Sequence, residues 1–147
     1  MVATKLYIIR HGKTMFNTIG RAQGWSDSPL TPEGERGIEE LGLVLKDSGI
    51  QFKAAFSSDS GRTLQTMEII LRECQQEAIP YTRDKRIREW CFGSLDGGYD
   101  GELFHGVLPR IVDKDMSKLT YQEMVEAIRQ VDTAGWAETW EVLSTRI

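Results

Sequence analysis

The chain has 147 residues, a length that suits one domain, and its 40% apolar content is enough for a hydrophobic core. Its net charge of -4 argues against general nucleic-acid binding, and its apolar runs are too short to predict a membrane span. The first residues lack the layout of a secretory leader, and Cys74 and Cys91 are predicted to be free thiols, so we expect a cytoplasmic protein. The histidines and cysteines lack metal-ligand spacing, and we expect neither a metal nor another cofactor.

The first predicted element is a buried strand at about residues 5–9, followed at once by Arg10, His11 and Gly12. In open α/β sheets, reactive groups lie just beyond the carboxyl ends of the strands. Arginine binds phosphate well, an imidazole is able to carry a phosphoryl group, and Gly12 would let a substrate approach the backbone. The segment therefore indicates phosphoryl transfer through a phosphohistidine.

His11 is expected to attack phosphorus with one free, neutral ring nitrogen. The other ring nitrogen should be held by a hydrogen bond, for which a backbone carbonyl is a common acceptor. An acidic protein needs a local cluster of cations to bind an anionic substrate, and Arg10, Arg21 and Arg62 are the candidates.

The polar loop over residues 13–30 offers further substrate-binding candidates. The side-chain amide of Asn17 is able to donate to a phosphate oxygen. Arg21 follows, and Gln23 with Gly24 is predicted to line the side of the leaving group. Ordinary loop polarity is the alternative for these residues.

Two helices and two strands are predicted next. One helix begins after Thr31 as its N-cap and ends at Gly49. A second strand over 54–56 precedes a helix with Arg62 in its first turn, and a third strand is predicted near 79–82. A cation is slightly unfavourable at a helix N-terminus, so Arg62 is predicted to serve a ligand. A solvated surface arginine is the alternative.

The rest of the chain is predicted to be a glycine-rich loop over 93–106, which contains His105, and then two helices. Thr120 and Glu123 predict a capping box at the start of the first of these helices. The last helix has an apolar stripe formed by Trp136, Trp140, Leu143 and Ile147. The stripe continues to the final residue, and three strands leave a parallel sheet incompletely covered, so we expect part of a longer fold.

Glu89 is the candidate acid. It lies beside Trp90 and Phe92, which would partly desolvate its carboxyl and suit it to protonate a leaving oxygen. The alternative is a simple ion pair with Arg86 or Arg88.

Together these residues resemble the histidine phosphatase superfamily, in its phosphoglycerate-mutase-like branch. The resemblance covers about residues 5–98 and is carried by Arg10-His11-Gly12 with Thr14 and Asn17, by Arg21, Gln23-Gly24 and residues 27–34, by Ser57-Ser58-Asp59 with Arg62 and Thr66, and by Glu89, Phe92-Gly93 and residues 95–97. It implies an α/β fold, a three-layer α/β/α sandwich on a mostly parallel sheet.

The resemblance also implies the roles of the site residues. His11 would accept the phosphoryl group, Arg10 and Arg62 would hold its oxygens with help from Asn17, and Glu89 would be the acid and then the base that activates water. The resemblance implies an enzyme without a metal, in which arginine, histidine and backbone donors meet the transition-state charge.

The sequence departs from the family at one position. The family has a second histidine after a late strand, and His105 is too early and follows no apolar strand. We therefore expect residues 1–147 to be a single phosphatase domain that ends before its C-terminal strand and its second catalytic histidine. A second copy of the chain could cover the open sheet edge as a homodimer.

Phosphatase and mutase activity differ in what accepts the phosphoryl group. In the mutases, a lysine follows the segment that corresponds to residues 95–97, with a pair of arginines after it, whereas Asp100 takes the place of the lysine here. An acidic wall is poorly suited to a phosphoglycerate. We predict a phosphomonoester phosphatase for a small phosphorylated metabolite, with a phosphoglycerate mutase or an inactive phosphate-ester-binding protein as alternatives.

Overall fold

The computed structural model describes residues 4–147, in which helices dominate. The helices are α1 (Met15–Ile19), α2 (Pro32–Asp47), α3 (Gly61–Glu73), α4 (Leu108–Val112), α5 (Tyr121–Val131) and α6 (Trp140–Arg146), and the strands are β1 (Ala55–Ser57) and β2 (Tyr81–Arg83). Short turns of 3₁₀-helix lie at Lys85–Ile87 (η1), Gly93–Leu95 (η2) and Met116–Lys118 (η4), and a π-helical segment (η3) spans Glu102–Val107. Every helix in this part of the chain is too short or too polar to traverse a lipid bilayer.

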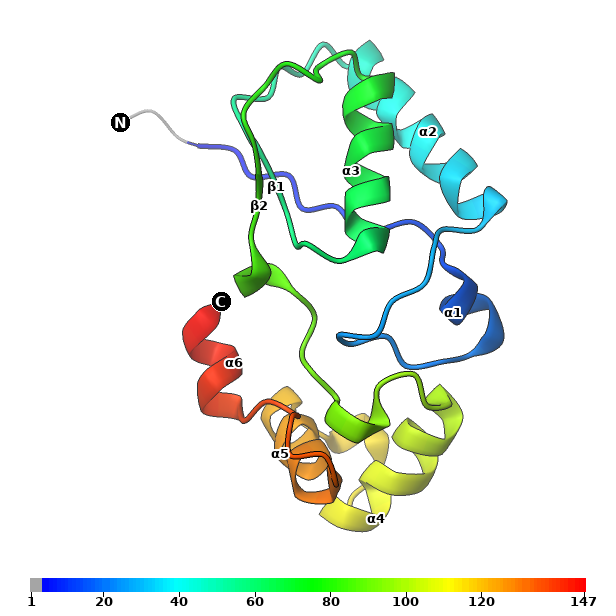
Figure 1. Cartoon of the computed structure of the whole chain (residues 1–147), viewed down its shortest axis with the longest axis vertical. Helices are drawn as coiled ribbons and strands as arrows, with labels where there is room; N and C mark the ends of the chain where they lie inside the picture. The colour runs from blue at the N-terminus through cyan, green and yellow to red at the C-terminus, as the bar shows by residue number, and fades with distance from the viewer. Residues whose placement is uncertain (1–3) are drawn as a thin grey trace.

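The strands β1 and β2 form a parallel pair, in which Ala55 lies opposite Tyr81 and Ser57 lies opposite Arg83. Helix α3 connects them, and α2 lies beside α3 on the same side of the strands (Figure 1). This is the parallel α/β arrangement that was predicted, with two strands in the described residues and boundaries shifted by one or two positions.

The predicted strand over residues 5–9 was wrong. The segment pairs with no strand in the described part of the chain, and Leu6 and Ile8 are 80% and 88% exposed. Tyr7 packs edge-on against Phe52, with ring centroids 5.5 Å apart. An apolar run indicates a preference for burial, but a strand also needs a neighbour that satisfies its backbone hydrogen bonds.

The predicted starts of two helices are confirmed. The Thr31 side chain accepts a hydrogen bond from the Gly34 N–H at the start of α2. Thr120 and Glu123 form both hydrogen bonds of a capping box at the start of α5. In each case a nearby side chain satisfies a backbone N–H that the first turn leaves free, so the signal is local in sequence.

Two helical segments lie where loops were predicted. Thr14 and Asn17 form a capping box that begins α1, with an asparagine where glutamate or glutamine is usual. The segment η3 occupies the end of the glycine-rich run and continues directly into α4, and Leu103 and Leu108 are buried on these two segments. This burial offsets the low helix preference of glycine. His105 consequently lies on η3, exposed to solvent.

The last helix is shorter than its predicted apolar stripe. Helix α6 begins at Trp140 and buries Leu143, whereas Trp136 and Ile147 are both 78% exposed. The predicted stripe was therefore wrong at both ends.

Two apolar clusters stabilise the molecule. The first lies between α2 and α3 and contains Leu30, Ile38, Leu45, Ile69, Ile70 and Cys74. The second joins the helices of the second half to the chain near Ala22 and contains Ala22, Trp90, Phe92, Leu103, Leu108, Val125, Ala127, Ile128, Ala137 and Leu143. Figure 1 shows the two corresponding parts, with α2 and α3 in one and α4, α5 and α6 in the other.

The second cluster predicts a large cost for truncating Leu108, whose side chain is 0% exposed. We expect Leu108→Ala to lower the free energy of unfolding by about 2–5 kcal/mol, because it removes buried apolar contacts and leaves a cavity. The matched control is Leu43→Ala on α2, where the leucine is 46% exposed and the loss should be about 0.5 kcal/mol or less. Urea unfolding measures both, and equal losses would contradict this account of the core.

Candidate active site

His11 is held where the first segment of the chain crosses the start of α2. A Cβ atom on Gly34 would lie 2.1 Å from the carbonyl oxygen of Lys13, so the crossing requires glycine. The Gly12 N–H donates to Thr66 Oγ1 at 3.0 Å, which ties the same segment to α3. Gly12 is buried against α2, so it serves helix packing and not the approach of a substrate that was predicted.

The imidazole of His11 is oriented as expected for a nucleophile. Its Nδ1 atom lies 2.8 Å from the Gly12 carbonyl oxygen, and because a carbonyl can only accept, Nδ1 carries the proton and Nε2 has the free lone pair. Burial lowers the pKa of His11 below its ordinary value of 6.5, and the nearby cations Arg62 and Arg10 lower it further, against the opposing hydrogen bond to Gly12. The ring is therefore neutral at pH 7.

His11 lines a cavity of about 420 Å³, which we call the main cavity. Six of the eight predicted site residues line it: Arg10, His11, Asn17, Arg21, Gln23 and Glu89. Its remaining lining is mostly apolar and consists of Ala22, Trp90, Phe92, Asp100, Phe104, Met116, Tyr121 and Met124. Arg62 and Gly24 lie behind this lining, and His105 is exposed elsewhere on η3.

Arg62 is 3% exposed, which excludes the solvated surface arginine considered as the alternative. Its Nη1 atom donates to the Ser26 carbonyl and to Asp27 Oδ1, both at 3.0 Å. Its Nη2 atom donates to the carbonyls of Gln23 and Gly24, at 3.2 and 3.0 Å. The Nε atom is buried without a hydrogen-bond partner among the described residues. The terminal fork of Arg62 therefore shapes the loop, and only Nε remains to serve an anion.

Gly24 marks a close crossing of two backbone segments. Its N–H donates to Asp96 Oδ1 at 2.9 Å, and a Cβ atom at this position would lie 2.5 Å from the carbonyl oxygen of Trp90. Asp96 also accepts from the N–H of Phe92 at 2.9 Å. Gly24 therefore joins the first loop to the segment that follows Glu89.

Thr14 orients the two amide side chains of the main cavity. Asn17 Oδ1 accepts from the Thr14 N–H at 3.1 Å, so its Nδ2 group is the part left to donate. Gln23 Oε1 accepts from Thr14 Oγ1 at 2.9 Å and from Ser28 Oγ at 2.8 Å. Gln23 Nε2 is buried without a hydrogen-bond partner among the described residues.

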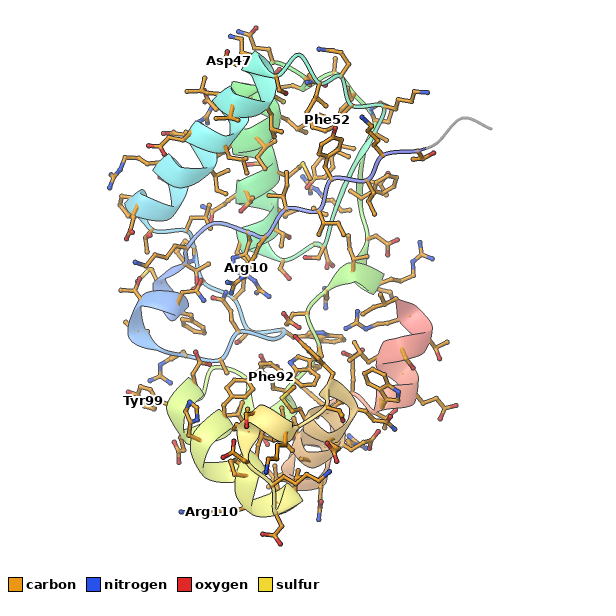
Figure 2. The ribbon with its side chains drawn as sticks, turned by 180° about the vertical axis from the view of Figure 1, so that it is seen from behind. Arg10, Asp47, Phe52, Phe92, Tyr99 and Arg110 are labelled. Atoms are coloured by element: carbon orange, nitrogen blue, oxygen red, sulfur yellow. The ribbon has the colours of Figure 1, made fainter. Side chains whose placement is uncertain are left out.

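The two other predicted arginines differ in how firmly they are held. Arg21 donates through Nη1 to the Gly97 carbonyl at 2.6 Å, and its guanidinium lies 4.4 Å from the centre of the Tyr99 ring. Arg10 is exposed, and Figure 2 shows it between the α2–α3 part of the molecule and the segment with Phe92. Arg10 is therefore the more exposed cation of the cavity wall.

Glu89 is exposed, so the predicted partial desolvation of its carboxyl by Trp90 and Phe92 was wrong, and it forms no ion pair with another described residue. Arg86 pairs with Asp84 and Arg88 pairs with Asp59, which excludes the ion pair that was the alternative for Glu89. Its carboxylate is free to face the main cavity.

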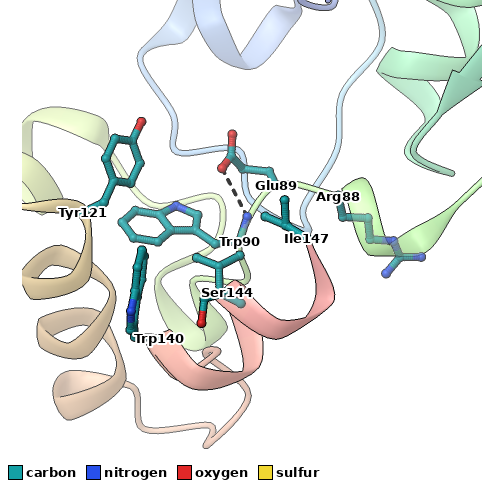
Figure 3. Close-up of a pocket in the computed structure, with 8 residues that line it drawn as sticks. Arg88, Glu89, Trp90, Tyr121, Trp140, Ser144 and Ile147 are labelled. Atoms are coloured by element: carbon teal, nitrogen blue, oxygen red, sulfur yellow. Dashed lines mark hydrogen bonds between the residues drawn. The ribbon is translucent and has the colours of Figure 1, made fainter. Parts of the chain in front are cut away.

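The backbone around Glu89 is held from two sides. Trp25 Nε1 donates to the Glu89 carbonyl at 3.0 Å, and the Glu89 carboxylate accepts from the Trp90 N–H at 3.2 Å (Figure 3). Glu89, Trp90 and Tyr121 also line a second cavity of about 320 Å³, beside α6 (Figure 3).

Sequence reasoning missed the residues that support the site from behind. These are Ser28, Asp27, Thr66, Asp96, Glu138 and Arg146. Asp27, Ser28, Thr66 and Asp96 were part of the family resemblance without a role, and the spacing of Thr14 and Asn17 was a usable capping signal. Glu138 and Arg146 act on residues 47 and 58 positions away in sequence, which no local pattern indicates.

The family model of the histidine phosphatase superfamily (branch 1) matches residues 6–140. The chain belongs to this superfamily. Within residues 4–147, no group of three or more histidine, cysteine, aspartate or glutamate side chains is placed to hold a metal ion. The expectation of a metal-independent histidine phosphatase stays a prediction.

The chain is similar to part of several proteins that are named phosphoglycerate mutases. The chain is 34% identical over 93 residues to a 2,3-bisphosphoglycerate-dependent phosphoglycerate mutase of Treponema pallidum, a match that covers 63% of this chain and 37% of the relative. It is 37% identical over 92 residues to the enzyme of that name from Xanthobacter autotrophicus, covering 63% of this chain and 44% of the relative. The matches thus span about two fifths of these histidine phosphatase relatives.

Solved structures agree with the fold. The crystal structure of phosphoglycerate mutase from Bacillus anthracis has a TM-score of 0.84 and 37% identity, and the match covers 92% of this chain and 60% of that one. YhfR of Bacillus stearothermophilus has a TM-score of 0.61 and 30% identity, covering 82% and 59% of the two chains. These structures support the α/β histidine phosphatase fold.

The environment of His11 predicts its titration. Because burial lowers its pKa, we expect the Cε1 proton resonance to titrate below pH 6.5, and Arg10→Met to raise the midpoint by removing a cation. As the pH falls, His11 takes up its proton in the unfolded chain before it does so in the folded chain. The contribution of neutral His11 to the stability of the folded state is therefore present above pH 6.5 and is lost as the pH falls below it. NMR titration measures the midpoint, and a His11→Gln variant assigns the resonance. A midpoint above 6.5 would refute the account.

Proposed function

We propose that this chain hydrolyses small phosphate monoesters through a phosphohistidine at His11. The supporting observation is a neutral imidazole with a free Nε2 in the same cavity as Gln23, whose Nε2 is buried without a partner. Buried donors without partners are rare in folded proteins. A bound phosphate oxygen would satisfy this donor, and Arg62 Nε is a second such donor behind the wall.

In the first step, His11 Nε2 attacks phosphorus while the ester oxygen departs. A P–N bond forms, the P–O bond to the alcohol breaks, and the departing oxygen takes a proton from Glu89. Nδ1 keeps its proton and its hydrogen bond to the Gly12 carbonyl. Arg10 and the Nδ2 group of Asn17 would meet the charge on the phosphoryl oxygens.

In the second step, water replaces the alcohol. Glu89, now a carboxylate, accepts a proton from the water as its oxygen attacks phosphorus, the P–N bond breaks, and inorganic phosphate leaves. His11 and Glu89 are thereby restored to their starting protonation states. The exposed position of Glu89 and its lack of an ion pair among the described residues suit a group that exchanges protons with solvent.

The relatives favour phosphoglycerate mutase as a second candidate function. Both relatives are named phosphoglycerate mutases, at 34% and 37% identity to this chain. The lining of the main cavity argues for the phosphatase, because Asp100 adds a negative charge to a wall that a phosphoglycerate would need to be cationic. A chain that binds phosphate esters without turnover is the third reading.

Hydrolysis of 4-nitrophenyl phosphate by the full chain tests the proposal. We expect turnover, and a loss on the order of 10³-fold or more in His11→Ala, because that variant lacks the nucleophile. A phosphoryl group stable to alkali and labile to acid should be trapped on the wild type and be absent from His11→Ala.

His105→Ala is the matched control, since His105 is exposed on η3 away from the main cavity, and it should retain full activity. Equal background rates in wild type and His11→Ala would refute hydrolysis through His11. Transfer between phosphoglycerates faster than phosphate release would select the mutase.

A further inference from the structure

Arg146, in the last turn of α6, is unusual because all five of its N–H donors are used inside the molecule. Nε donates to Glu138 Oε1 at 2.6 Å, and Nη2 donates to Glu138 Oε2 at 2.8 Å. The other donors go to backbone carbonyls: Nη1 to those of Arg86 and Arg88, the latter at 2.9 Å, and Nη2 to that of Glu89 at 3.1 Å. A guanidinium has five donors in a fixed plane, so this set fully satisfies it.

Glu138 completes the arrangement from the other side. Its side chain is 7% exposed, that of Arg146 is 14% exposed, and Glu138 Oε2 also accepts from the Cys91 N–H at 2.9 Å. The pair therefore holds the backbone on both sides of Glu89. We call this pair the Arg146–Glu138 clamp.

The segment held by the clamp has no regular structure to fix it. Residues 89–91 lie between the turns η1 and η2 without helical or strand hydrogen bonding. Among residues 4–147, the carbonyl of Glu89 accepts only from side chains, namely Trp25 and Arg146. Figure 3 shows α6 running directly beside this segment. The direction in which the Glu89 side chain leaves the backbone thus depends on these two contacts.

We propose that the Arg146–Glu138 clamp positions Glu89 for proton transfer to the leaving oxygen. This inference rests on the proposed function, in which Glu89 is the acid. Arg146 is a positioning residue, because all its donors are occupied inside the molecule. It lies on α6, the helix beside the second cavity, but it lines neither cavity. Lysine has three donors on a flexible stem and cannot bind three carbonyls and a carboxylate in one plane.

The readout is the dependence of rate on the leaving group. Phenolate is a poorer leaving group than 4-nitrophenolate and needs a proton more, and kcat/KM reports only the steps through transfer to His11. We define the ester ratio as kcat/KM for phenyl phosphate divided by kcat/KM for 4-nitrophenyl phosphate. The ratio is independent of the fraction of folded enzyme, since both values scale with it.

We expect Glu89→Gln to lower the ester ratio by on the order of 10²-fold, the size of a lost general acid. Arg146→Lys should lower the ratio about tenfold, in the same direction, because the acid is present but displaced. Glu138→Gln should act similarly, since it keeps an acceptor for Cys91 but loses the charge that anchors Arg146. If Arg146→Lys does not fold, the ester ratio of Glu138→Gln tests the clamp on its own.

Arg72→Lys is the matched control, because Arg72 also pairs with glutamates, Glu73 at 2.7 Å and Glu39 at 3.3 Å, on α3 and α2 and away from residues 86–91 and Glu138. Its ester ratio should stay within about twofold of wild type, the scatter expected of a structural change alone. An unchanged ratio in both Arg146→Lys and Glu138→Gln would overturn the clamp's role while leaving the phosphatase intact. An unchanged ester ratio in Glu89→Gln would also overturn the clamp's role. If the wild type hydrolysed the esters no faster than His11→Ala, the proposed function itself would be overturned.

Discussion

The buried guanidinium of Arg62 fixes the loop from which the polar side of the main cavity is built. Removing a cation from water costs several kcal/mol unless its donors find acceptors, and Arg62 finds them in the carbonyls of Gln23, Gly24 and Ser26 and in the carboxylate of Asp27. The loop therefore has to keep the one shape in which these acceptors converge on α3. Gln23 acquires its place in the cavity wall as a consequence.

The site is assembled from two parts of the molecule that have separate apolar clusters. His11 and Arg62 belong to the part with α2 and α3, whereas Glu89 belongs to the segment that packs on the second cluster through Trp90. Asp96 joins the two, because its carboxylate accepts from Gly24 in the first loop and from Phe92 beyond Glu89. The polar contacts of Asp96, together with the packing of Ala22 in the second cluster, thus set the distance between the imidazole and the carboxyl group.

The parts of the fold that could be predicted are those whose signals are local. The helices at Thr31 and Thr120 begin where a capping side chain stands within three residues of the N–H that it satisfies. The strand over 5–9 could not be judged in this way, because a strand depends on a neighbour that is distant in sequence.

The same distinction applies to the candidate site. The gathering of six predicted residues around one cavity followed from the motifs at His11, Asn17 and Glu89. How Arg62 uses its donors could not be predicted, since its acceptors, three carbonyls and the Asp27 carboxylate, lie 35 to 39 residues away and their direction depends on the folded loop. The supports of Glu89 from α6 were hidden for the same reason.

The close crossing at Gly34 has a mechanical consequence. With no side chain between Lys13 and the first turn of α2, the backbone on either side of His11 lies directly on the helix and has no soft layer to absorb movement. A small tilt of α2 relative to α3 would strain the hydrogen bond from Gly12 to Thr66 and move the imidazole relative to Arg62, which stays with α3. The angle between α2 and α3 therefore sets the position of the His11 imidazole relative to the Arg62 guanidinium. Substitutions in the core between these two helices would change that position without contacting the site.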